Sequence, residues 1–230
     1  MQTCYIERML KAGAQSPSRP EGPDPAGRST KNRIVEAAIE TLKRRGFAGA
    51  SARAIAVQGG FNQALIFYHF GTLHRLLLAA LDRTSAERLQ SYRRAVASAG
   101  SLEDLLDVAA AVYAEDLRSG HIKVLAEMIA GASSAPELGP EIVRRVEPWI
   151  DFAAAQIGRA LKGSGVEGIV PARDAAYALV AQYLGIELLS HLQGDTAAAD
   201  SLFNVAGNIG RLLGPMLQLG AAMGEADGRE

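Results

Sequence analysis

The sequence contains a single cysteine, Cys4, and only four histidines among its 230 residues. One thiol excludes an intrachain disulfide, and the histidines at positions 69, 74, 121 and 191 are too scattered to form a metal-ligand motif. The sequence therefore predicts no disulfide framework, no metal site and no bound cofactor.

Long apolar runs are also missing. The longest stretches, such as residues 76–81, end at charged residues within two turns, well short of the roughly 18 residues that a membrane-spanning helix needs. Residues 1–11 mix charged side chains with scattered apolar ones, so they lack the continuous apolar core of a secretory signal. We therefore expect a cytoplasmic protein that does not enter the membrane.

The composition is that of a globular protein, with 48% apolar and 21% charged residues. The net charge of −1 hides an asymmetry, because residues 28–80 hold eight basic and two acidic side chains while residues 81–230 are acidic overall. A basic module followed by a larger acidic one indicates a polyanion-binding head on a body that does not bind polyanions.

Helical patterns follow one another along most of the chain, and no alternating strand pattern of useful length is present. Residues 1–28 are expected to form a disordered arm, since four prolines fall within residues 17–25. Helices are predicted at residues 31–45, 52–58, 63–70, 73–96, 102–117, 122–132, 137–161, 172–192 and 197–219, with Thr30, Ser51, Asn62 and Thr72 as N-caps. The fold class is all-α, with about nine helices.

The second and third predicted helices are short and are joined by a turn that contains Gly59 and Gly60. A helix-turn-helix unit requires such a tight turn, so that its second helix projects into the major groove of DNA. Gly60 supplies a backbone that can adopt positive φ at the turn. The basic excess in the same segment makes DNA the expected partner.

The run SARAIAVQGGFNQALIFYHFGTLHRLLLAAL, from Ser51 to Leu81, resembles the DNA-binding region of TetR-family regulators. The matching residues are Ile55, Ala56, Gly60, Ile66, Tyr68, His69, Phe70, Leu76 and Leu77. The resemblance implies a three-helix helix-turn-helix domain at residues 29–75, which a long helix joins to a ligand-binding and dimerisation domain at residues 76–225. It also implies a homodimer that binds a pseudo-palindromic double-stranded DNA operator and is a repressor released by a small-molecule effector.

Two alternatives stay open at this point. One is a transcriptional activator on the same fold, and another is an architectural DNA-binding dimer without a ligand. An enzyme is not expected, because the sequence shows no nucleophile–base constellation, Gly-rich phosphate loop or paired carboxylates in an apolar stretch.

Gln63 is the first choice for base readout, because it lies at the start of the predicted recognition helix and a glutamine can pair bidentately with adenine. Ile66 and Phe70 are expected to hold this helix on the first helix. Phe67 and Leu73 replace a tyrosine and a lysine of the family pattern, which predicts fewer phosphate contacts. The full set of expected DNA-contacting residues is Lys43, Ser51, Arg53, Asn62, Gln63, Ala64, Leu65, Phe67, Tyr68 and His69; for Arg53 and Lys43, a solvated surface charge is the alternative.

Small residues in the last two helices predict close helix packing, because interior glycines lower helix stability and are typical of close backbone approach. The expected dimer interface comprises Ala178, Ala181, Gly185, Gly207, Gly210 and Gly214, with packing inside one chain as the alternative. Candidate ligand contacts are polar-tipped or large apolar side chains of the body, any of which is alternatively a core residue: Tyr92, Tyr113, His121, Met128, Trp149, Phe152 and Tyr183. The sequence does not identify the ligand.

Overall fold

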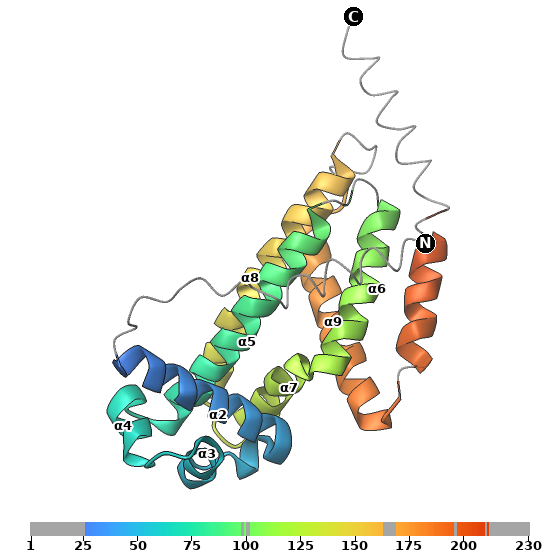
Figure 1. The fold of residues 1–230 in the computed structure, drawn as a ribbon. Helices are drawn as coiled ribbons and strands as arrows, with labels where there is room; N and C mark the ends of the chain where they lie inside the picture. Colours follow the sequence, from blue (N-terminus) through green and yellow to red (C-terminus); the bar gives the residue numbers. More distant parts are fainter. Residues whose placement is uncertain are drawn as a thin grey trace, which may run out of the picture. The chain divides into compact units, whose positions relative to one another are not determined.

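The computed structural model describes residues 26–97, 99, 102–162, 169–195, 197–209 and 211. Every regular element within them is a helix, so the all-α prediction is confirmed (Figure 1). The helices are α2 (Ala26–Gly49), α3 (Ala52–Gly59), α4 (Ala64–Phe70), α5 (Leu73–Val96), α6 (Leu102–Ser119), α7 (His121–Ala132), α8 (Leu138–Leu161) and α9 (Ala172–Gln193). Residues 197–209 form a further helical segment.

The predicted bounds of α3 to α9 agree with the structure to within two residues, but the start of the first helix does not. Helix α2 begins at Ala26, so Thr30 lies inside it and the prediction of Thr30 as an N-cap is wrong. Residues 26–28 are helical rather than part of an arm, because no proline follows Pro25 to prevent a helix from starting there. The rest of the predicted arm, residues 1–25, lies outside the described residues.

Gly46, Ser51 and Thr72 end and begin helices where the sequence predicts. Gly46 has φ 67° and ψ −179°, which breaks the regular helix inside α2 at the residue where the sequence predicts its end. The Ser51 hydroxyl accepts a hydrogen bond of 3.2 Å from the Ala54 amide, and the Thr72 hydroxyl accepts one of 3.2 Å from the Arg75 amide. Both predicted N-caps are therefore confirmed.

The chain packs as two compact units, described separately below. The head unit comprises described residues 26–91 together with Asp116–Arg145, and the body unit comprises Tyr92–Glu115 with the described residues from Val146 onward. Helices α5, α6 and α8 contribute residues to both units. The domain boundary at residues 75 and 76 stays a prediction, but α7 and the start of α8, which the sequence assigned to the body, pack with the head.

One apolar core holds the head unit together. It combines buried side chains from six helices: Ile34, Ile39 and Leu42 of α2, Ile55 of α3, Ile66 and Phe70 of α4, Leu76 and Leu77 of α5, Val124 and Met128 of α7, and Leu138 and Ile142 of α8. Each fully buried side chain of this size stabilises the fold by about 1.5–3 kcal/mol. Because α7 and α8 complete this core, the three short N-terminal helices do not enclose it by themselves.

A close contact in the head unit joins the kink of α2 to α7. The Phe47 amide donates a 2.9 Å hydrogen bond to Oε2 of Glu127. A Cβ at Gly46 would lie 2.7 Å from the same oxygen, and a Cβ at Gly131 would lie 2.4 Å from carbons of the Phe47 ring. Glycine is therefore required at Gly46 and Gly131 for α2 and α7 to approach this closely.

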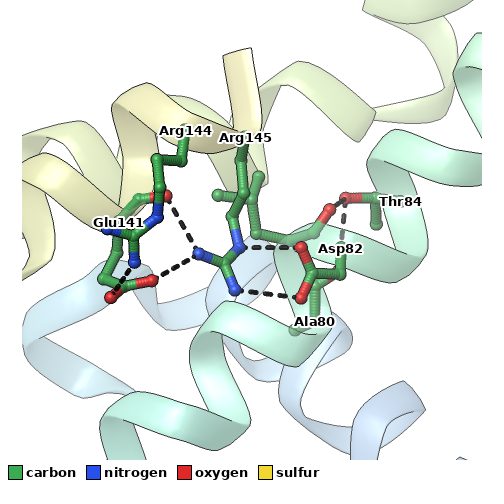
Figure 2. Close-up of polar contacts among 7 residues, drawn as sticks. Ala80, Asp82, Thr84, Glu141, Arg144 and Arg145 are labelled. Carbon is green, nitrogen blue, oxygen red and sulfur yellow. Dashed lines mark hydrogen bonds and ion pairs between the residues drawn. The ribbon is translucent and has the colours of Figure 1, made fainter. Parts of the chain in front are cut away.

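Polar contacts tie α5 to α8 within the head unit (Figure 2). The Arg145 guanidinium donates to both carboxylate oxygens of Asp82, at 2.7 and 3.1 Å, and to Oε2 of Glu141 at 2.9 Å. His74, in the first turn of α5, pairs with Glu137 at 3.1 Å. A two-point guanidinium–carboxylate bond fixes orientation as well as distance, so α8 is held in register with α5.

The body unit contains two smaller apolar clusters. Ala95 and Val96 of α5 pack with Val108 and Val112 of α6, and Ile150 and Ala153 of α8 pack with Ala176 of α9. On the surface of the unit, Arg173 of α9 pairs with Glu147 and Asp151 of α8 at 2.5 and 2.6 Å. These contacts link α5 to α6 and α8 to α9.

No single helix in the described part of the chain is long and apolar enough to cross a membrane. The consecutive helices α4 and α5 reach that length and apolar composition only together, and they are bent by 71° relative to each other. Within the same residues, no three His, Cys, Asp or Glu side chains are grouped so as to hold a metal ion.

We expect Gly131→Ala to destabilise the head unit, because its methyl group would meet the Phe47 ring. Displacing that ring costs about 1–3 kcal/mol, only partly offset by the higher helix propensity of alanine. Gly139→Ala is the matched control, since no atom lies within 4 Å of its Cβ position. Urea unfolding should show a lower midpoint for Gly131→Ala alone; equal midpoints would show that the junction adapts.

We expect Arg145→Lys to lower the free energy of unfolding by about 1 kcal/mol or less, because lysine cannot make the two-point bond to Asp82. Arg144→Lys is the control, since Arg144 bonds to Glu141 of its own helix. Hydrogen bonds from Arg144 and Arg145 hold the pKa of Glu141 below its ordinary value. The contribution of Glu141 should therefore be present at neutral pH and lost only as the pH falls through that lowered pKa, which urea unfolding across an acidic pH series would measure.

Candidate nucleic-acid interface

A tight turn follows α3 and places α4. Gly60 has φ 65° and ψ 41°, the left-handed conformation predicted for it, and the Phe61 amide donates a 3.1 Å hydrogen bond to the Ala56 carbonyl. A Cβ at Gly59 would lie 2.2 Å from the Phe61 ring and 2.8 Å from Cβ of Ala37. Gly60 therefore allows the reversal of the chain, and Gly59 allows the turn to pack on α2.

Arg33 of α2 also holds this turn, a role that the sequence analysis missed. Its Nη2 donates a 3.3 Å hydrogen bond to the Gly59 carbonyl, the last residue of α3. A basic residue 26 positions before the turn carries no local sign of this contact. Arg33 thereby satisfies a helix-terminal carbonyl that lacks a partner within the helix.

Helix α4 is anchored on one side and exposed on the other. The N-cap of α4 is Gln63, whose side chain makes no capping bond, and not the predicted Asn62. The Asn62 Oδ1 accepts a 2.9 Å hydrogen bond from the Ala64 amide just before the helix, and Gly71 ends the helix with φ 76°. Ile66 is fully buried and Phe70 nearly so, both in the core that contains Ile39 and Leu42 of α2. The prediction that Ile66 and Phe70 hold this helix on the first helix is confirmed.

Most of the expected DNA-contacting residues lie on exposed surfaces of α3 and α4. Asn62, Gln63 and Ala64 are exposed at the start of α4, and Arg53 is exposed in the first turn of α3. Tyr68 is 82% exposed and Phe67 is 50% exposed. His69 is half-buried, with its ring edge-on to that of Tyr68 at 4.9 Å. Their contacts with DNA stay a prediction.

Three of the expected residues have other contacts. The Ser51 hydroxyl is used as the cap of α3, and Leu65 is half-buried against the head core. Lys43 is half-buried and pairs with Glu40 at 3.7 Å. Because Glu40 offsets its charge, Lys43 attracts phosphate less strongly than the sequence alone suggests, and its predicted role is untested.

Five of the seven candidate ligand residues come together in the body unit. The hydroxyls of Tyr92 and Tyr183 are 2.9 Å apart, and the Tyr92 ring meets those of Trp149 and Phe152 at centroid distances of 5.1 and 6.5 Å. Tyr113 meets Tyr183 edge-on at 5.9 Å. These residues come from α5, α6, α8 and α9, so their convergence is a property of the fold.

Met128 does not group with these aromatic side chains, because it is fully buried in the apolar core of the head unit, and its role as a ligand contact stays a prediction. An unbranched apolar side chain in a packed core needs no further explanation. His121 begins α7, but its side chain lies outside the described part of the structure.

The small residues expected at the dimer interface are open where the structure describes them. Ala178 and Ala181 are exposed, and no atom of the chain lies within 4 Å of a Cβ built at Gly185 or Gly207. Gly210 and Gly214 lie outside the described residues. The structure adds exposed apolar side chains that the sequence analysis did not select, namely Leu188, Leu189 and Leu192 of α9 and Leu202, Val205 and Ile209 of the segment 197–209.

The profile of the family described as bacterial regulatory proteins, tetR family, matches residues 34–80, from α2 into α5. An HTH-type transcriptional repressor of Mycobacterium tuberculosis is 35% identical over 88 residues, which are 38% of this chain and 46% of that protein. The chain thus spans about half the length of the curated relatives that it matches.

Two solved structures share the fold. The TetR-family transcriptional regulator from Cytophaga hutchinsonii has a TM-score of 0.66 at 15% identity over 81% of this chain and 96% of that one. A transcriptional regulator from Saccharomonospora viridis, solved in complex with choline, has a TM-score of 0.64 at 20% identity over 79% of this chain and 95% of that one.

The family profile covers the same residues that form the glycine turn, the anchored helix α4 and the start of α5. The curated relatives and the shared all-helical fold agree with that match. Residues 34–80 therefore match the DNA-binding part that is described for the tetR family of bacterial regulatory proteins.

Proposed function

We propose that this protein is a sequence-specific DNA-binding transcriptional regulator that acts as a homodimeric repressor and is released from its operator by a small molecule. The observation that carries the proposal is α4, which is anchored in the core by Ile66 and Phe70 and exposes Asn62, Gln63 and Ala64 beside a glycine turn. In a helix-turn-helix unit, the N-terminal residues of the second helix contact base edges.

The base-reading roles follow from chemistry and exposure. Gln63 has an exposed amide that can pair with one adenine through two hydrogen bonds, donating to N7 and accepting from N6. It is therefore the proposed reader of one base pair in each half-site. Arg53 on α3 suits guanine or a phosphate. Tyr68 is the proposed phosphate contact, while Phe67 has no hydroxyl to add a second one.

A homodimer is supported by the outward face of α9. Ala178, Ala181, Gly185, Leu188 and Leu192 follow at spacings of three and four, which places them on one face of a helix. Leu192 is 72% exposed, and contact of its apolar side chain with water does not stabilise the protein. A second copy of this face would bury the stripe, as in a two-fold four-helix bundle.

A ligand-responsive function is supported by the aromatic group of the body unit and by the related fold that was solved with choline. Helices α5, α6 and α8 have residues in both units, so rearrangement in the body is covalently connected to the head. A ligand lowers operator affinity only as far as it prefers a conformation that binds DNA less well.

A footprint on the DNA flanking the gene, repeated across a salt series, tests the proposal. Protection of a palindrome with half-sites about one helical turn apart is the expected result. Salt-sensitive coating without a specific site would favour an architectural DNA-binding dimer. Increased transcription from a specific site would favour an activator on the same fold.

We expect Gln63→Ala to relax base preference at one position in each half-site, with a loss of about 1–3 kcal/mol of discrimination. Gln90→Ala, an exposed glutamine of α5, is the matched control and should leave the preference unchanged. Lys43→Ala should weaken binding to all DNA sequences alike. Selection of binding sites from a random DNA library measures all three variants, and unaltered discrimination by Gln63→Ala would contradict the placement of the recognition helix.

We expect Leu192→Glu to shift the protein from dimer to monomer, because it places a charge in the proposed apolar interface. Val143→Glu, which changes an exposed valine of α8 in the head unit, is the control. Sedimentation velocity measures the change directly. A dimer that persists in Leu192→Glu would show that α9 does not form the interface.

A further inference from the structure

The exposed face of α4 carries no lysine, arginine or carboxylate. The helix reads ALIFYHF, and its Ile66 and Phe70 side chains are buried in the head core. Ala64, Phe67 and Tyr68 are exposed. Because Phe67 and Tyr68 follow Ala64 at spacings of three and four, these three side chains lie on one face of the helix. The outward face of a surface helix is normally charged or polar, so the apolar pair Ala64 and Phe67 is unusual there.

Phe67 is not an anchor of α4. The half-buried Leu65 of the same helix packs against the head core, whereas half of the surface of Phe67 stays exposed. An apolar ring in contact with water stabilises the protein only when a partner covers it. The exposed ring therefore indicates a contact that forms on binding.

Positive charge around α4 indicates that this partner is DNA. Residues 41–81 contain five lysines or arginines and no aspartate or glutamate. At the end of α4, Nζ of Lys31 lies 5.3 Å from the centroid of the Phe70 ring. Nη1 of the exposed Arg75 lies 3.6 Å from the Cβ position of Gly71. These cations attract phosphate at the end of the helix and leave its uncharged face for the bases.

The side chains of α4 limit which bases this face can read. Guanine is bound most often by arginine or lysine, and the amino group of cytosine by aspartate or glutamate. Helix α4 has none of these four residue types. The 5-methyl group of thymine is contacted by apolar side chains such as those of alanine and phenylalanine. Ala64 and Phe67 are therefore matched to thymine, and the neighbouring Gln63 is matched to adenine.

We propose that Ala64 and Phe67 recognise the 5-methyl groups of thymines, so that the base pairs facing α4 in each half-site are A·T pairs. The Phe67 ring packs on one methyl group, and Gln63 contacts an adenine of the same group of base pairs. This inference rests on the proposed function, because it names the bases that the DNA-binding helix reads.

Deoxyuridine tests this inference, since it lacks the 5-methyl group of thymidine and pairs with adenine in the same way. Sites that the full-length protein selects from a random DNA library are synthesised with deoxyuridine at one half-site thymine at a time, and binding is measured by fluorescence anisotropy. At least one such change in each half-site should weaken binding about fourfold, which corresponds to about 0.8 kcal/mol for one buried hydrocarbon group.

Deoxyuridine at thymines outside the half-sites is the control and should leave the affinity unchanged. Less than twofold weakening at every half-site thymine would overturn the proposal. Selected half-sites that contain only G·C pairs would overturn it as well.

Phe67→Ala distinguishes contact with a methyl group from an effect of that group on the shape of the DNA. At one half-site position this variant should bind thymine and deoxyuridine DNA equally well, because the ring that contacts the methyl group is gone. Val143→Ala, which shortens an exposed apolar side chain of α8, is the matched control and should keep the fourfold difference. A difference that persists at every position in Phe67→Ala would overturn the assigned role of the ring. If circular dichroism shows that Phe67→Ala does not fold, the comparison of the two DNAs with the unaltered protein still decides the proposal.

Failure of this inference is distinguishable from failure of the proposed function. A protein that protects a palindromic operator but binds thymine and deoxyuridine DNA alike remains a DNA-binding regulator and loses the thymine contacts. A protein that depends on thymine methyl groups but raises transcription when bound keeps these contacts, and the proposed repressor function is then rejected. Equal binding to all DNA sequences rejects both.

Discussion

The head unit depends on the contact between the kink of α2 and helix α7. Gly46 turns the backbone out of the helix at φ 67°, which frees the Phe47 amide to donate to Glu127 and lets the Phe47 ring cover Gly131. A bulkier residue at Gly46 would meet the carboxylate, and one at Gly131 would meet the ring. Because the chain passes from this kink directly into α3, the contact also fixes where the turn and α4 begin. Helices α2, α3 and α4 therefore pack together with α7 in one core. A displacement of α7 acts on α2 through a hydrogen bond and a ring contact.

Recognition by α4 requires that one face be rigid and the other free. Ile66 and Phe70 supply the rigid face through burial in the head core, while Arg33 and Gly59 hold the turn on α2. The free face then presents short polar and aromatic side chains at the start and middle of the helix. Few of the expected phosphate-contacting groups are available, since Lys43 of α2 is paired with Glu40 and Phe67 of α4 has no hydroxyl. We therefore expect attraction to phosphate to depend on fewer groups than the basic excess of residues 28–80 suggests.

Helix α9 gives the body unit its distinct chemistry. Its outward face offers leucines and small residues, while on its inward face Tyr183 and Ser190 meet the hydroxyls of Tyr92 and Tyr113, and Glu187 is buried. An apolar exterior is stable when another apolar surface covers it, and a polar interior is stable when polar or charged groups meet it. One helix therefore places the proposed dimer face and the tyrosine contacts of the body unit back to back, so that a rearrangement on one side and a partner subunit on the other act on the same backbone.

The sequence by itself determined the helices, because apolar periodicity, glycine breaks and capping side chains such as Ser51 and Thr72 are local. It predicted α5 with its observed bounds, the left-handed Gly60, and Ile66 and Phe70 as the anchors of α4. It misplaced the start of α2, because helix formation after Pro25 needed no capping residue at Thr30. Only the tertiary structure decided that α7 packs with the head, that Met128 belongs to that core, that Arg33 holds the turn, and that the hydroxyls of Tyr92 and Tyr183 meet. Each of these outcomes depends on residues distant in sequence, whose approach is set by packing of whole helices and leaves no local signal in the chain.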